Sequence, residues 1–176
     1  MGDISRHIGV ELGISPWFTI DQDRINAFAD ATDDHQWLHV DVERAERERG
    51  GTIAHGYLTL SLLAPLVAAA WQAEGISHSL NYGIDRLRFV APVPAGAHIR
   101  CRETLLSVDR RETGQLRRRA TTVEIDGSEQ PALVAESLML WCRPSPHPDR
   151  SMPRCYCHPM SILLDVIHSV RETIAR

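Results

Sequence analysis

A carboxylate and an imidazole lie five residues apart in the polar segment 31–41, whose sequence is ATDDHQWLHVD. The carboxylate belongs to Asp34 and the imidazole to His39. A carboxylate near a histidine raises its basicity and fixes its tautomer, and such a pair can take a proton from water. The spacing alone leaves a second interpretation open, in which Asp33 or Asp34 only caps backbone groups of the loop.

A second candidate lies at His55-Gly56, directly before the apolar segment 57–73. We expect that segment to be a helix, and the unpaired N–H groups where a helix begins favour developing negative charge. The Gly56 N–H could therefore stabilise an enolate-like thioester oxygen. In the alternative interpretation Gly56 permits a turn and His55 packs in the core. Ser61, one turn into the helix, either faces a substrate or bonds its own helix backbone.

The elements that must position these residues follow from the hydrophobic pattern. Before the apolar helix, the pattern predicts a short strand, two helices that begin after an aspartate cap, and a polar loop between them. Their ranges are 17–20 for the strand, 22–31 and 42–49 for the helices, and 32–39 for the loop. Pro65 removes one backbone hydrogen bond from the apolar helix and should bend it.

The second half of the chain changes to an alternating apolar and polar pattern, which is typical of strands. Four strands are predicted, at 80–91, 97–109, 115–126 and 132–142. Turn residues lie between consecutive strands, so we expect a meander of four long antiparallel strands. A buried helix wrapped by such a sheet is an α+β architecture.

The chain has 176 residues, enough for one domain of ordinary size. We expect residues 1–143 to fold as one domain. Five of the ten prolines lie within 144–159, which predicts a linker in a tail spanning 144–176. Apolar residues recur at helical spacing over 162–175, so a short helix is expected there.

Composition excludes several classes of function. The net charge of −4 argues against a nucleic-acid-binding protein, and all 19 cations are arginines, which excludes Schiff-base lysine chemistry. Cys155 and Cys157 form a C-x-C rather than the C-x-x-C of common zinc sites, so we expect no metal. The longest nearly apolar run, 57–71, is too short to span a bilayer, and no signal peptide is evident. We expect a cytoplasmic protein without a membrane partner.

Two motifs resemble those of the MaoC-like family of (R)-specific enoyl-CoA hydratases. DHQWLH at 34–39 is similar to the family's D-x-N-P-x-H motif, and IAHG at 53–56 is similar to the segment that follows it. The longer stretch DHQWLHVD is more similar still to the NodN-like branch and its hydroxyacyl-thioester dehydratase relatives. The resemblance covers about residues 10–142.

The resemblance implies a hotdog fold, in which a curved antiparallel sheet surrounds one long helix, and a homodimer. It implies reversible hydration of a trans-2-enoyl thioester of CoA or acyl-carrier protein to the (R)-3-hydroxyacyl thioester, with no cofactor. Asp34 and His39 match the catalytic residues of the motif. The residues expected to bind substrate or stabilise the enolate are Gly56, Gln36, His55 and Ser61. Gln36 replaces the family's Asn and carries its amide one methylene further out.

Two other functions remain open at this point. A hotdog thioesterase would use the same Asp34–His39 pair to direct water at the thioester carbonyl and would release free thiol. A non-catalytic binding module for acyl thioesters would use the same groove and turn over nothing. The presence of both an acid and a base favours the enzymes, because a binding module has no need of the pair.

Overall fold

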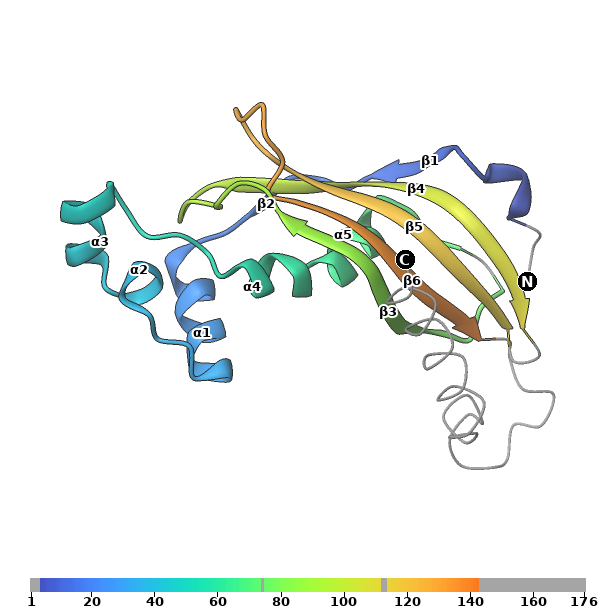
Figure 1. Cartoon of the computed structure of the whole chain (residues 1–176), viewed down its shortest axis with the longest axis horizontal. Helices are drawn as coiled ribbons and strands as arrows, with labels where there is room; N and C mark the ends of the chain where they lie inside the picture. Colours follow the sequence, from blue (N-terminus) through green and yellow to red (C-terminus); the bar gives the residue numbers. More distant parts are fainter. Residues whose placement is uncertain (1–3, 74, 112–113, 143–176) are drawn as a thin grey trace, which may run out of the picture.

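The computed structural model describes residues 4–73, 75–111 and 114–142 (Figure 1). The first part is mainly helical and the second is a set of long strands. In chain order the elements are η1 (Ser5–His7), β1 (Glu11–Ile14), β2 (Phe18–Thr19), α1 (Gln22–Thr32), α2 (Trp37–Val40), α3 (Val42–Arg49), α4 (Gly56–Ser61), α5 (Leu63–Ala70), β3 (His78–Phe89), β4 (His98–Arg111), β5 (Gly114–Ile125) and β6 (Leu133–Cys142).

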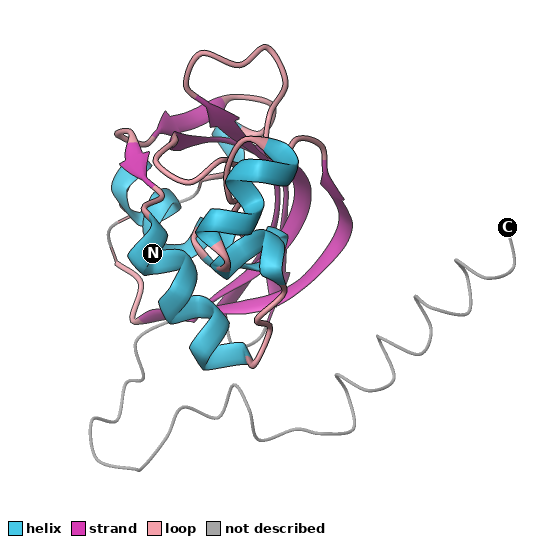
Figure 2. Cartoon of the chain, turned by 90° about the vertical axis from the view of Figure 1, so that its left-hand side faces the viewer, coloured by secondary structure: helices cyan, strands magenta, loops and turns pink. Residues whose placement is uncertain are grey.

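The strands form one antiparallel sheet in the order β1-β4-β5-β6-β3, with β2 also paired to β4. The sheet curves around α4 and α5, as Figures 1 and 2 show from two directions. Leu58 of α4, Leu66 of α5 and Leu62 between them are buried in the main core. Ile99 and Val123 of the sheet belong to the same core. The predicted α+β architecture, with apolar helix inside and curved sheet outside, is therefore confirmed.

The predicted meander is wrong for its first strand. β3 pairs with β6 along ten register positions rather than with β4, the next strand in the chain. The connection after β3 does not reverse as a hairpin, because it is bound to the segment before α4. Ala54 N–H donates to Val93 O and Ala95 N–H donates to Thr52 O. The turn signals at 92–96 thus belong to a crossover between the two edges of the β4–β5–β6 meander.

The long apolar helix is divided in two at Leu62. Pro65 has no N–H to donate to the carbonyl of Ser61 four residues earlier, so the regular bonding pattern is interrupted there. The predicted bend is therefore a break, and α5 ends at Ala70, earlier than the predicted 73. This break leaves α4 as a short helix whose first residue is Gly56.

Local signals placed the other helices well. Asp21 and Asp41 accept hydrogen bonds from the N–H groups of Arg24 and Arg44, as N-caps do. Strand β1 was not predicted, and α2 lies inside the segment predicted as a loop. None of the helices in the described ranges is long and apolar enough to cross a membrane. The predicted linker and helix within 144–176 lie outside the described residues.

Candidate active site

Asp34 follows directly after the residue that ends α1. Asp33 adopts a left-handed conformation with φ of 57°, which terminates the helix and turns the chain. Aspartate tolerates this conformation better than most residues because its short side chain can bond locally. The turn projects the loop that carries Asp34 toward α2 and the segment before α4. Asp33 therefore acts as a helix terminus, whereas Asp34 is half-buried beside the two histidines.

His39 is buried in α2, and its tautomer is fixed by a backbone carbonyl. Its Nδ1–H donates to Ile53 O at 2.7 Å, so Nδ1 carries the proton and the neutral ring has its lone pair on Nε2. Gln22 holds the same residue from α1, because its Nε2–H donates to His39 O at 2.8 Å. Thr52 in turn donates to the Gln22 Oε1. These contacts leave Nε2 as the basic atom of a firmly positioned imidazole.

Burial lowers the pKa of His39 below the 6.5 of an ordinary histidine. The hydrogen bond to Ile53 O raises it by less, and the neighbouring His55 lowers it further. The ring is therefore neutral at pH 7 and able to accept a proton.

His55 connects the two motifs. Its Nε2–H donates to the backbone oxygen of Asp34 at 2.9 Å, and its ring stacks on that of His39 with centroids 3.7 Å apart. Phe28 of α1 packs on the ring of His55. His55 is thus buried, as its alternative interpretation has it, and it contacts both Asp34 and His39.

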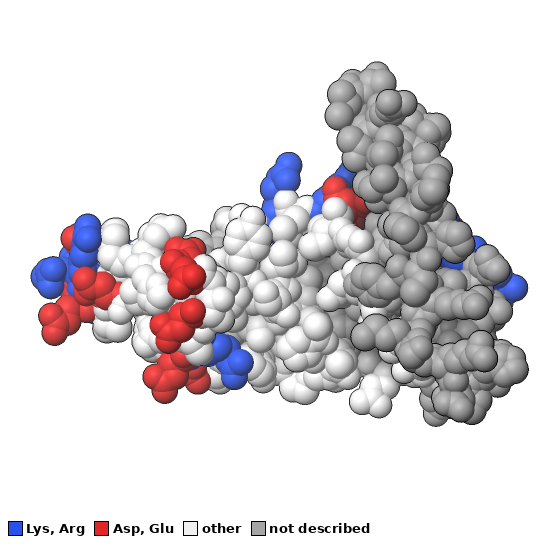
Figure 3. All heavy atoms as spheres, turned by 90° about the horizontal axis from the view of Figure 1, so that it is seen from below, with Lys and Arg blue, Asp and Glu red and all other residues white. Residues whose placement is uncertain are grey.

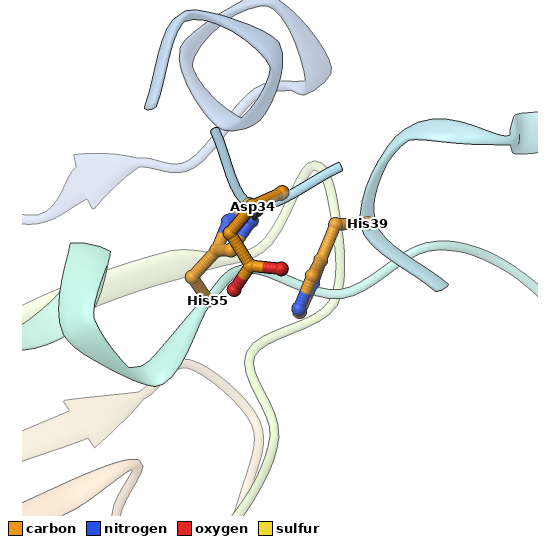
Figure 4. A group of neighbouring side chains, drawn as sticks. All are labelled: Asp34, His39 and His55. Carbon is orange, nitrogen blue, oxygen red and sulfur yellow. Dashed lines mark hydrogen bonds between the residues drawn. The ribbon is translucent and has the colours of Figure 1, made fainter. Parts of the chain in front are cut away.

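The side chains of Asp34, His39 and His55 converge (Figure 4). A carboxylate oxygen and one nitrogen from each ring all lie within 4.8 Å of one another. A water molecule that hydrogen-bonds two groups at about 2.8 Å and a tetrahedral angle joins atoms about 4.6 Å apart. The arrangement can therefore hold one water between Asp34 and His39. Two histidines and one carboxylate could also hold a divalent cation.

Comparison with known proteins identifies the family of this chain. Residues 3–127, more than half of the chain, match the family model described as MaoC like domain. The chain belongs to the MaoC-like family. The resemblance seen in the two motifs is thereby confirmed.

Relatives of this MaoC-like domain include 3-hydroxyacyl-thioester dehydratase Z of Mycobacterium tuberculosis H37Rv, 44% identical over 79% of this chain and 93% of the relative. Nodulation protein N of Rhizobium leguminosarum is 45% identical over 77% of this chain and 86% of its own. Among solved structures, the R-hydratase PhaJ1 of Pseudomonas aeruginosa aligns with a TM-score of 0.62 at 21% identity, covering 82% and 94% of the two chains. The (R)-hydratase of A. caviae aligns with a TM-score of 0.61 at 22% identity, covering 74% and 96%. These structural likenesses support the predicted hotdog fold.

Of the other expected site residues of this MaoC-like domain, Gly56 lies next to the cluster. Gly56 begins α4 next to His55, and a Cβ added there would lie 3.1 Å from the ring of Phe89. The side chain of Gln36 is exposed and makes no capping bond, while its carbonyl accepts the His39 N–H. Ser61 is exposed and donates to Tyr57 O at 2.8 Å, the helix-backbone bond given above as its alternative.

The residues that support His39 in the MaoC-like site, Gln22 and Ile53, were not predicted from the sequence. Gln22 was assigned only to a helix, and the carbonyl of Ile53 carries no signal in its residue type. A glutamine at the first position of a capped helix is ordinary on its own. Its link to His39 depends on α1 and α2 packing together, which the pattern of apolar residues does not specify.

Proposed function

We propose that the protein is a hydro-lyase that reversibly adds water to trans-2-enoyl thioesters to give (R)-3-hydroxyacyl thioesters. One observation carries the proposal: the Asp34 carboxylate and a neutral His39 lie close enough to share one water. The dehydratase name of the mycobacterial relative and its coverage of nearly the whole of that protein support the same reaction class. The (R)-hydratase structures support the fold in which it takes place.

In the proposed reaction the water lies between the Asp34 carboxylate and His39 Nε2. Its oxygen forms a bond to C3 of the enoyl thioester as the pair accepts one of its protons. The electron pair of the C2–C3 double bond moves toward the thioester carbonyl, and the resulting enolate takes the proton at C2. The atoms of one water are thus divided between C3 and C2. The Gly56 N–H, which has no partner within its helix, would donate to the thioester oxygen.

His55 acts as a positioning residue in this proposal. It bonds the backbone of Asp34 and stacks on His39, so it fixes the distance between the two groups that share the water. Gln36 and Ser61 have exposed side chains and would contact the substrate at the solvent-exposed edge of the site.

The test mixes purified protein with crotonyl-CoA and follows the conjugated enoyl absorbance and free thiol in the same samples. Hydration predicts loss of absorbance without release of thiol, and a product that chiral analysis identifies as (R). Thiol release would instead assign a thioesterase. Binding of crotonyl-CoA and of longer enoyl-CoAs without either signal would assign a binding module. Chelator in a parallel sample should leave the rate unchanged, because the proposed steps use no metal.

The pH dependence of hydration should reflect the lowered pKa of His39. Only the neutral ring can accept the proton, so kcat/KM is expected to fall on the acid side as His39 becomes protonated. Because burial places its pKa below 6.5, the midpoint of that fall should also lie below 6.5. A pH profile of kcat/KM with crotonyl-CoA measures it. A midpoint at or above 6.5 would contradict the assignment of His39 as the buried base.

The carrier of the acyl group is proposed to be CoA or acyl-carrier protein. Both present the same thioester to the cluster, and the groups described so far contact only the acyl part. We place the reaction in the cytoplasm, where these thioesters occur and where a free thiol such as that of Cys101 remains reduced. Comparing crotonyl-CoA with crotonyl-carrier protein would decide between the carriers.

A homodimer is expected to form on the face that carries α4 and the edge strand β3. Large apolar side chains are exposed there, with Tyr57 67% and Phe89 44% accessible. Figure 3 shows that charged side chains are sparse on the middle of the underside of Figure 1. Light scattering should give twice the mass of the chain. Val90 is exposed, and Val90→Glu should lower the measured mass toward that of one chain. A monomeric wild-type protein would contradict the dimer.

A further inference from the structure

A cavity of about 310 Å³ lies between the central helices and the edge of the sheet. One wall is apolar and comes from Leu60, Leu63 and Ala64, with Ser61 beside them. The opposite wall comes from β3, β5 and β6 and includes two buried polar side chains, Arg119 and Ser137. A cavity that holds only an alkyl chain needs no polar wall, so this pair requires an explanation.

The cavity lies further along the same helical segment than Gly56 of the proposed reaction centre. Gly56 and Leu60 share one face of α4, Leu63 and Ala64 begin α5 after the break, and Phe89 packs close to Gly56 from β3. Ser61 lies about 7.5 Å along the axis of α4 from Gly56, at 1.5 Å per residue, and Ala64 lies beyond the break in α5. An extended chain advances about 1.2 Å per bond. An acyl chain held at Gly56 would therefore reach this cavity from about its seventh carbon onward.

The polar wall has unused hydrogen-bonding capacity. Arg119 donates from Nη1 to Glu103 Oε1 at 2.8 Å and from Nη2 to Ser137 Oγ at 3.1 Å. Its Nε–H has no partner in the structure, although the side chain is only 6% exposed. The Ser137 hydroxyl accepts from Arg119 and still has its own proton to donate. A ligand oxygen in the cavity could accept from the Ser137 hydroxyl, next to the Arg119 guanidinium.

The charge of this wall indicates which kind of ligand oxygen it would bind, charged or neutral. Glu103 is fully buried and forms a direct ion pair with Arg119, the charged side chain that lines the cavity. The buried Arg117 lies over the ring of Trp141 and does not line the cavity. A second negative charge in the cavity would face the Glu103 carboxylate at low dielectric. A neutral hydroxyl or carbonyl oxygen can accept the free hydrogen bonds without adding charge.

We propose that the enzyme selects enoyl thioesters whose acyl chain carries a neutral oxygen function, a hydroxyl or a carbonyl, at or shortly beyond its seventh carbon. Arg119 and Ser137 are the residues that determine this specificity. The inference rests on the proposed hydratase function, because it uses Gly56 and the Asp34–His39 pair to locate the start of the chain.

The experiment compares kcat/KM for hydration of trans-2-octenoyl-CoA and 8-hydroxy-trans-2-octenoyl-CoA, with crotonyl-CoA as the reference. The wild-type protein is expected to prefer the hydroxylated substrate about tenfold or more, since the unhydroxylated chain leaves buried donors unsatisfied. Hydration of crotonyl-CoA without any preference in the octenoyl pair would overturn the inference and leave the proposed function intact. Failure to hydrate all three would overturn both.

Two variants test whether the polar wall of the cavity causes the preference for the hydroxylated substrate. Ser137→Ala removes one hydroxyl, and Glu103→Met combined with Arg119→Met removes both charges together, so that no unpaired charge is left buried. Both should bring the ratio of the two kcat/KM values close to one while crotonyl-CoA is still hydrated.

Arg118→Met is the matched control. It removes a guanidinium from the adjacent position of β5, on the opposite face, where Arg118 pairs with Asp85. Its ratio should equal that of the wild-type protein. A preference that persists in Ser137→Ala and in the double variant, or that is lost equally in Arg118→Met, would contradict the assignment to this wall.

Discussion

Replacing Asp34 by Asn is expected to slow hydration of crotonyl-CoA by about 10²- to 10⁴-fold. Asn has nearly the same shape, so the loop after α1 keeps its bond to His55, but the uncharged amide can no longer act with His39 as an acid–base pair. His39→Ala should cost a similar factor, because it removes the Nε2 lone pair that faces the same water. The measurement is kcat and KM for both variants from the loss of enoyl absorbance.

The matched control is Asp33→Asn at the neighbouring position. Asp33 is exposed and adopts a left-handed conformation that Asn also tolerates, so activity should stay within about twofold of wild type. Because Asp34 and His39 act on one water, the double variant should be little slower than either single variant. Retention of full activity in Asp34→Asn, with circular dichroism unchanged, would remove this residue from the mechanism.

The parts of the fold that were predictable are those set by neighbours in the sequence. Helix α3 occupies the predicted range, Val42–Arg49, because Asp41 caps its first turn and Gly50 ends it in a left-handed conformation with φ of 78°. The alternation of apolar and polar residues likewise placed the four long strands to within three residues at their ends. Each of these signals acts over a few residues and does not depend on the tertiary structure.

The pairing of β3 with β6 could not be predicted from such local signals. The same alternation fits β3 beside β4, and only the hydrogen bonds between the crossover and residues 52–54 favour the observed order. The same distinction between local signals and long-range contacts applies to the site. The motif identified Asp34 and His39, but the support of His39 by Gln22 and by the Ile53 carbonyl arises from contacts between segments far apart in the chain.

The buried ion pair on the concave face of the sheet should dominate the stability of this region. Glu103 is fully buried and accepts from Arg119, which is 6% exposed. Glu103→Ala would leave the guanidinium buried without its carboxylate, and breaking a buried pair in this way costs about 3–5 kcal/mol. We expect the free energy of unfolding, measured by urea denaturation, to fall by that amount.

Glu124→Ala is the comparison that separates burial from charge. Glu124 accepts from Arg100 and Arg102 on the other face of the sheet, where its side chain is 29% exposed. Water can solvate the arginines that it leaves, so its loss should cost at most about 1 kcal/mol. The apolar double variant Glu103→Met with Arg119→Met should recover much of the loss in Glu103→Ala, because no charge is then left buried. Equal losses in Glu103→Ala and Glu124→Ala would show that Arg119 finds solvent or another partner once Glu103 is absent. The cavity wall proposed to select a neutral oxygen would then not depend on that carboxylate for its charge.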